Sequence, residues 1–166
     1  KLHSHAYLEK IHPQSLKPVK QSPRLPGGPF WPGGFAIHRN GDIYLTFGRF
    51  MHHLDADCSL LHSRELPQNL PYNSQVILDN GLLVTKPLME RGTSYLVLLD
   101  PTSLEIMAQI EIPEPSISRL SSTGNTVYLT GVSTIYRYHY NDKHQTLMRD
   151  EHWQFDYIQG STQSYG

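Results

Sequence analysis

The sequence predicts an all-β protein, specifically a β-propeller segment of about three four-stranded antiparallel blades behind an N-terminal arm. Short runs rich in β-branched and aromatic residues alternate with turn-forming residues, and no window has the 3.6-residue period of a helix. The plan of one such unit returns twice at a period in the low to middle forties, a period typical of propeller blades. A β-sandwich, whose strands are also short and evenly spaced, is the alternative.

The first unit, residues 31–67, shows the plan most clearly. Asn40-Gly41 separates the first two apolar runs, and both residues tolerate the positive φ of a type I′ hairpin turn. Gly48 and Arg49 form the next turn, and a polar turn starting at Asp55 precedes the last run. Four strands are therefore expected, at residues 35–38, 43–47, 50–54 and 60–66.

Three landmarks of this unit recur in the same order further along the chain. The first is the Asn-Gly turn, the second is the end of the third strand, and the third is the Pro that ends the fourth strand. They recur as Asn40-Gly41, Asn80-Gly81 and Gly124-Asn125; as Leu54-Asp55, Leu99-Asp100 and Asn141-Asp142; and as Arg64–Pro67 and Ile110–Pro113.

These landmarks divide the chain into five parts. We expect a Pro-rich basic arm at residues 1–30, blades at 31–67, 68–113 and 114–153, and the start of a further blade or a tail at 154–166. Propellers have about four to eight blades, so three cannot close a ring. The expected partners therefore include the remaining blades of the same protein, and Phe155–Ile158 is expected to open a fourth blade.

Composition excludes several function classes. The net charge of −1 gives no global reason to expect a nucleic acid or an anionic membrane as partner. Cys58 is the single cysteine, so no internal disulfide forms. The ten histidines are scattered, and His52 and His53 are strand neighbours whose side chains leave opposite faces. No catalytic motif is present, so no catalytic residue, metal ligand or cofactor is assigned.

Candidate ligand-binding residues lie in the inner loops, by which we mean the loops that precede the first strand of a blade or join its second and third strands. These loops emerge on one face of a propeller, where binding residues concentrate. Trp31 has an alternative role, as a plug that packs with Phe30 over the end of the core. The candidates are Trp31, Arg49, Tyr72, Asn73, Lys86, Arg91 and Ser116.

Three phrases resemble blades of known propeller families. PGGFAIHRNGDIYLT and PYNSQVILDNGLLVTK are similar to phrases of the gluconolactonase (senescence marker protein) and NHL-repeat propellers. LVLLDPTSLEIMAQIEIP resembles YVTN and quinoprotein-like blades. For a lactonase, the resemblance implies a divalent metal on the axis held by Asn, Asp and Glu. Asn73 matches one such position, whereas Lys86 and Phe47 stand where that family places an acid.

These observations lead to three functional hypotheses. The first is a propeller scaffold that binds a small-molecule or protein ligand through its inner loops. The alternative is a fragment of a lactonase-like or quinoprotein-like enzyme, whose metal or cofactor site is completed by missing blades. A purely structural segment is the third, since blade patterns are shared by many functions.

Overall fold

The computed structural model describes residues 5–27, 32–67, 71–87, 93–115 and 119–157. The described residues form strands and turns without any helix, which confirms the all-β prediction. Accordingly, none of them belongs to a helix that could span a membrane. The chain divides into two compact units, Lys1–Asn73 and Ser74–Gly166.

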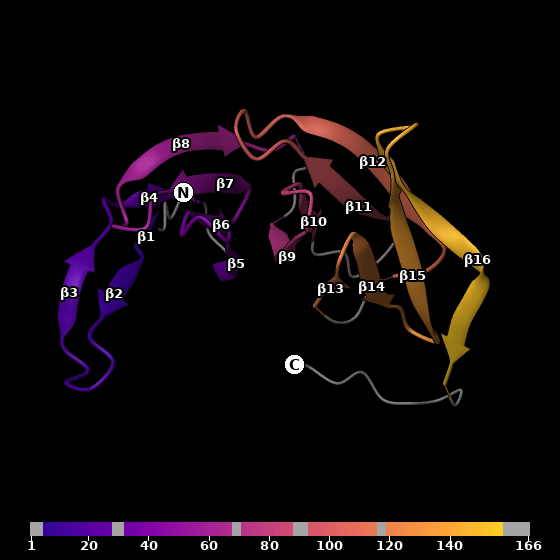
Figure 1. Ribbon diagram of the computed structural model, residues 1–166, viewed down its shortest axis with the longest axis horizontal. Helices are drawn as coiled ribbons and strands as arrows, with labels where there is room; N and C mark the ends of the chain where they lie inside the picture. The colour runs from indigo at the N-terminus through magenta and orange to yellow at the C-terminus, as the bar shows by residue number, and fades with distance from the viewer. Residues whose placement is uncertain (1–4, 28–31, 68–70, 88–92, 116–118, 158–166) are drawn as a thin grey trace. The chain divides into compact units, whose positions relative to one another are not determined.

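The first four-stranded sheet contains β5 (Pro32–Ile37), β6 (Ile43–Phe47), β7 (Phe50–Leu54) and β8 (Leu60–Glu65), in that spatial order (Figure 1). All neighbours are antiparallel. The predicted Asn-Gly turn is present, because Gly41 N donates to His38 O and Gly41 has a φ of 94°. Its predicted type I′ geometry is wrong, since Asn40 does not have the positive φ that this turn type also needs. β5 begins three residues earlier than the sequence predicted.

The second and third sheets repeat this order of strands. Both have a turn with a positive-φ glycine at the predicted place, Gly81 with a φ of 90° and Gly124 with a φ of 59°. The second sheet consists of β9 (Tyr72–Ile77), β10 (Leu83–Pro87), β11 (Ser94–Leu99) and β12 (Ile106–Ile112); the third consists of β13 (Ser121–Thr123), β14 (Thr126–Thr130), β15 (Thr134–Asn141) and β16 (Thr146–Asp156).

The last strand extends further than the sequence predicted. Phe155 pairs with Ile135 and Asp156 pairs with Thr134, so both residues belong to the third sheet. The expectation that they open a fourth blade is therefore wrong; its last residue, Ile158, lies outside the described residues. A register shift between Tyr136 and Tyr138 accommodates the extra length of β16, and the strand then continues along β15.

The core of the second unit lies between its two sheets. Val84, Leu96 and Leu98 of the second sheet pack with Val127 and Leu129 of the third and with further apolar residues of both. The strands alternate sides, so each contributes every second side chain to this interface. Burial of these leucines and valines is worth roughly 2 kcal/mol each in the hydrophobic term.

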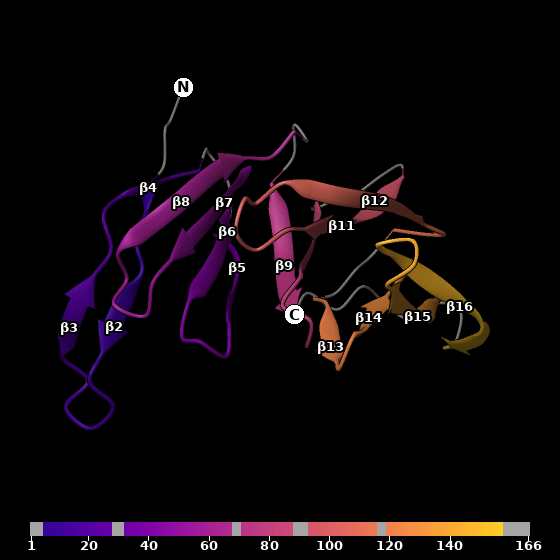
Figure 2. The same cartoon turned by 45° about the horizontal axis from the view of Figure 1, so that its top comes forward.

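Residues 5–26 form a β-hairpin rather than an irregular arm. The strands are β1 (His5–Ala6), β2 (Glu9–Ile11), β3 (Pro18–Gln21) and β4 (Leu25–Pro26), where β1 pairs with β4 and β2 pairs with β3. β2 and β3 lie side by side in both ribbon views (Figures 1 and 2). Prolines are compatible with such short edge strands because no neighbour needs their missing N–H.

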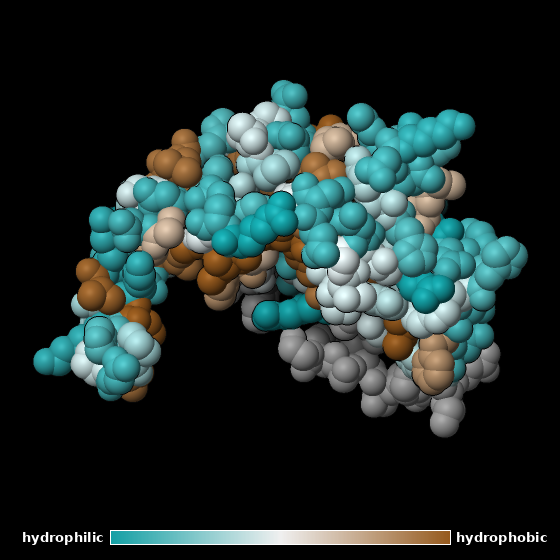
Figure 3. Space-filling view, in the orientation of Figure 1, coloured by the Kyte–Doolittle hydropathy of each residue, from teal (hydrophilic) through white to brown (hydrophobic). Residues whose placement is uncertain are grey.

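This hairpin covers part of the first sheet. Leu8 and Leu25 pack with Ile43, Leu45 and Leu54 in one apolar cluster. Other apolar residues of the hairpin, Ile11, Leu16 and Val19, are exposed, and apolar groups are visible on this part of the surface in Figure 3.

His52 fixes the hairpin to the first sheet through a buried hydrogen bond. Its Nε2 donates to Pro26 O at 2.9 Å, which leaves Nδ1 to accept from Ser63 Oγ at 2.6 Å. Burial lowers the pKa of His52, although the bond to Pro26 opposes this. The ring is therefore neutral near pH 7, and both of its nitrogens have partners.

Candidate functional site

The predicted ligand-binding residues lie in different parts of the structure. Trp31, Arg91 and Ser116 lie outside the described residues. Arg49 lies in the β6–β7 turn as predicted. The other three were predicted in loops, but Tyr72 and Asn73 lie in β9 and Lys86 lies in β10.

Arg49 is held by the first sheet. Its guanidinium forms a hydrogen-bonded ion pair with Glu65, and Leu66 N donates to Arg49 O at 2.7 Å. Both side chains of the ion pair are well exposed, so the pair contributes little to stability. Its charge is already matched by an acid, which makes Arg49 a weak candidate for holding an anionic ligand.

Tyr72 joins the start of β9 to the same turn. Its N donates to Gly48 O at 2.7 Å, and its side chain is buried. Gly33 lies close by, because a Cβ there would stand 2.5 Å from Tyr72 O. The structure thus brings the backbones of Tyr72 and the Arg49 turn together, and places Asn73, half-buried, next in the strand.

Lys86 is the unusual residue of this set. Only 2% of its surface is exposed, and no acid of the described residues forms an ion pair with its ammonium. It is two residues beyond Val84, so it lies on the face of the second sheet that packs against the third. Burial lowers its pKa from 10.5 to about 8.

Lys86 belongs to a group of buried polar residues at one end of the second sheet. β10 ends there while β9 and β11 begin there, so this end carries the inner loops. We call it the inner-loop end. Its buried polar residues are Ser74, Gln75, Thr85, Lys86 and Ser94.

Ser74 organises the backbone of this end. It has a φ of 64°, which is uncommon for a residue other than glycine, and such strain often accompanies binding sites. Thr85 Oγ1 donates to its carbonyl at 2.7 Å, and its Oγ accepts from Leu120 N at 2.8 Å. Ser74, Gln75 and Ser94 were not predicted from the sequence; the polar run from Asn73 to Gln75 in an apolar strand was the available signal.

Glu114, in the inner loop before the third sheet, has a structural role. Its carboxylate accepts from Thr134 N at 2.9 Å, from Ser133 N and Oγ, and from Tyr136 Oη at 3.1 Å. A Cβ on Gly131 would stand 2.2 Å from its Oε1, so the turn closes around the carboxylate. These donors occupy the acid, which therefore offers little to a ligand or metal.

The described residues contain no group of three or more His, Cys, Asp or Glu side chains that could hold a metal ion. His53 is paired with Asp42 at 2.8 Å and stacks on Tyr44 with ring centroids 4.4 Å apart. It therefore has structural partners, as His52 does.

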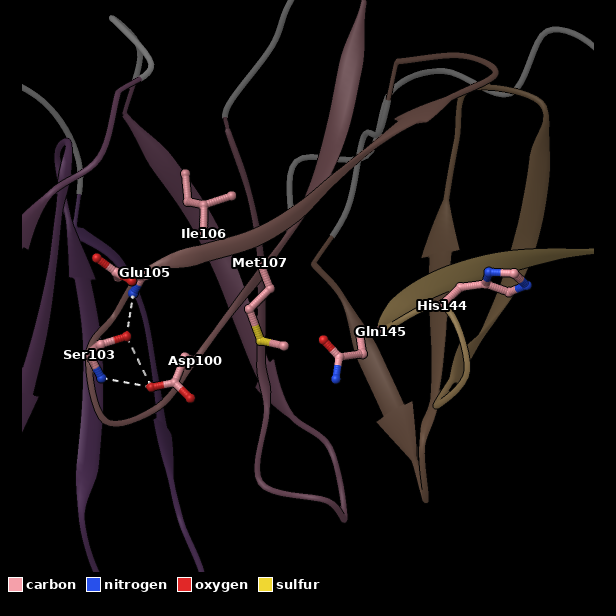
Figure 4. A pocket seen from close by; sticks show the side chains of 7 residues that line it. All are labelled: Asp100, Ser103, Glu105, Ile106, Met107, His144 and Gln145. Carbon is pink, nitrogen blue, oxygen red and sulfur yellow. Dashed lines mark hydrogen bonds between the residues drawn. The ribbon is translucent and has the colours of Figure 1, made fainter.

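An open depression of the second unit lies between two turns at the opposite end of the strands (Figure 4). Ser103 N donates to the Asp100 carboxylate at 2.7 Å, and this bond is the main cause that lowers the pKa of Asp100. Met107 and Gln145 face each other across it, while the ring of His144 extends away. Because Asp100 is used by its own turn, its carboxylate is not available to select a ligand there.

No protein-family model and no curated protein matches the sequence. Solved structures do match. A functionally unknown protein from Desulfotomaculum acetoxidans DSM 771 has 16% identity and a TM-score of 0.62 over 91% of this chain and 49% of its own. BamB from Moraxella catarrhalis has 13% identity and a TM-score of 0.57 over 95% of this chain and 39% of its own.

A third match is BBS1N, solved in complex with ARL6DN, with 12% identity and a TM-score of 0.55 over 81% of this chain and 43% of its own. The chain thus spans less than half the length of these three structures. At such identities the likeness defines the fold alone. Together with the three antiparallel sheets of identical strand order, it shows that the protein has the β-propeller fold.

Proposed function

We propose that this protein is a propeller scaffold that binds an anionic ligand at the inner-loop end of the second sheet, with Lys86 as the cation that holds it. The ligand is a small molecule with a carboxylate or phosphate group, or an acidic side chain of a protein. The observation that carries the proposal is the nearly complete burial of Lys86 without an acidic partner among the described residues.

The electrostatics favour an anion as the missing partner. With a pKa of about 8, Lys86 is still about 90% protonated at pH 7, so the buried group is mainly a cation. Buried charges are normally paired, because an unpaired one has lost its hydration without compensation. An anionic ligand would supply that compensation, and the buried hydroxyl and amide groups of Ser74, Gln75 and Ser94 are chemically suited to further hydrogen bonds.

The alternative is the lactonase-like or quinoprotein-like enzyme. In the lactonase case a divalent cation would be held by oxygen ligands, and Asn73 is the residue that matches the family phrase. A hard cation needs several oxygen ligands, and a buried ammonium beside it would oppose binding. The two functions therefore predict responses to ligands of opposite charge.

Thermal unfolding with a set of small ions tests the proposal. We expect at least one of acetate, citrate, inorganic phosphate and pyrophosphate to raise the Tm by mass action on the folded state. The rise should disappear in Lys86→Met and persist in Lys143→Met, a matched change at an exposed lysine. Equal responses in both variants, or no response to any of the anions, would contradict the proposal. A rise with Ca²⁺ alone would support the lactonase alternative.

A further inference from the structure

The turn of the N-terminal hairpin has the same backbone as a turn of the second sheet. In residues 12–17 and 100–105 alike, the first residue donates to the carbonyl of the sixth, at 3.0 and 2.9 Å, and accepts from the fifth at 2.9 Å. The fifth residue has a left-handed backbone in both, with a φ of 55° at Leu16 and 56° at Leu104. Such agreement at a non-glycine residue identifies the two turns as equivalent.

The strands beside these turns share a further irregularity. A register shift occurs between Lys10 and Ile11, immediately before the turn of the hairpin. The same shift occurs between Leu98 and Leu99 in the second sheet and between His53 and Leu54 in the first. The hairpin therefore has the geometry of the outer two strands of a sheet, with β1 and β2 in place of the third strand and β3 and β4 in place of the fourth.

The end of the hairpin agrees with this assignment. Leu25 is buried and followed by Pro26, as Leu66 is buried and followed by Pro67 where the first sheet ends. Ile112 and Pro113 hold the same positions at the end of the second sheet. Four independent features thus match: turn length, left-handed residue, register shift and terminal apolar-Pro pair.

The inner edge of the hairpin differs from its equivalents. In the described part of the chain, β1 pairs only with β4 and β2 only with β3, whereas β7 and β11 have a neighbour on each side. Ile11 is 53% exposed, while its equivalents Leu54 and Leu99 are 0% exposed. An open edge with exposed apolar side chains is a template for further strand pairing.

We propose that the open edge of residues 5–11 is an interaction surface for a β-hairpin of the β5–β6 kind. That partner consists of two antiparallel strands joined by a tight turn, and it would complete a fourth four-stranded sheet. Its nearer strand places an apolar residue opposite Ile11, because Ile43 stands opposite Leu54 and Leu83 opposite Leu99 in the complete sheets. Main-chain bonds supply affinity, and this apolar position supplies register.

A fusion that supplies such a hairpin tests the proposal. A second copy of residues 32–49 is placed directly before His5. The final Gly-Arg of this copy corresponds to the turn that precedes β7 in the first sheet. The short tether gives a high effective concentration. We expect amide hydrogen exchange in residues 6–11 to slow by at least about tenfold, since paired edges open only by local unfolding.

The control fusion carries Leu45→Pro in the added copy alone, because proline removes a ladder hydrogen bond. It should leave exchange in residues 6–11 as fast as in the unfused chain. Exchange in residues 95–99 serves as the internal measure that the rest of the chain is folded. Equal exchange in the two fusions would overturn the proposal. Sedimentation of the unfused chain as a dimer with protected residues 6–11 would also overturn it, since a second copy would then occupy the edge.

Discussion

Replacing Lys86 by methionine is expected to raise the free energy of unfolding at pH 7 by about 3 kcal/mol, since a fall in pKa from 10.5 to about 8 corresponds to that penalty on the buried ammonium. Methionine has a similar length and no charge, so it fits the same space without the loss of hydration. Stability gained at a residue whose removal abolishes ligand binding is the usual sign of a functional site.

The destabilising effect of the buried Lys86 ammonium is expected to decrease as the pH rises. The pKa of Lys86 is lower in the folded protein, so the penalty is fully present below about pH 8 and shrinks as the folded state loses its proton first. Between pH 7 and 9.5 the wild type should gain about 2 kcal/mol relative to Lys86→Met.

The comparison ends at pH 9.5 because tyrosines act in the opposite direction above it. Burial raises the pKa of Tyr138 to about 12, and the stability associated with its neutral form is lost above pH 10. Denaturant unfolding of the wild type, Lys86→Met and Lys143→Met across pH 7 to 9.5 checks the prediction. A less stable Lys86→Met at pH 7 would show that the ammonium has a favourable partner.

Replacing Gly48 by alanine is expected to lower the free energy of unfolding by at least about 3 kcal/mol, because it adds a backbone clash to an unfavourable φ. Gly48 has a φ of 57°, and a Cβ there would stand 2.1 Å from Gly27 O. That carbonyl accepts from Arg49 N at 3.4 Å, and Gly48 O accepts from Tyr72 N. The turn that carries Arg49 and the start of β9 would therefore both have to move.

Gly124→Ala is the matched control for this change. Gly124 has a φ of 59°, but the nearest atom to a Cβ there is Asp79 Oδ2 at 4.0 Å. Its loss should be about 1 kcal/mol, the conformational contribution alone. Urea unfolding of both variants measures the difference. Equal losses would contradict the close approach of Gly27 and Gly48.

The strands of the three sheets could be predicted from the sequence because their signals are local. Asn40-Gly41 and its equivalents fix hairpin turns through positive φ, and β-branched and aromatic runs fix the strands beside them. β6 and β7 match the predicted residues at both ends.

The N-terminal hairpin was not predicted as strands because its signals are weak and partly masked by proline. Pro13, Pro18 and Pro23 suggest an irregular arm. The sequence pattern of this segment also does not include the first and second strands of a blade. The pair Leu25-Pro26, equivalent to Leu66-Pro67, was the available signal. This pair resembles the end of the fourth strand of a blade, but the strands that usually precede such an end were not recognised in the sequence.

The burial of Lys86 could not be predicted, because charged residues are mostly exposed and Lys86 is followed by a predicted loop. What buries it is tertiary packing: it continues the face of Val84, which packs on the third sheet. For Arg49, the position was predicted but the ion pair was not. The sequence placed it correctly in a turn, but its ion pair with Glu65 joins that turn to β8 and has no local signal.

The direct test of this account is the titration of Lys86 itself, followed by NMR of its side-chain Cε and Nζ in the wild type. We expect a pKa of about 8 in the free protein and a higher value when a bound anion stabilises the ammonium. A pKa near the ordinary 10.5 in the free protein would contradict it, because it would show that the ammonium is hydrated or already paired.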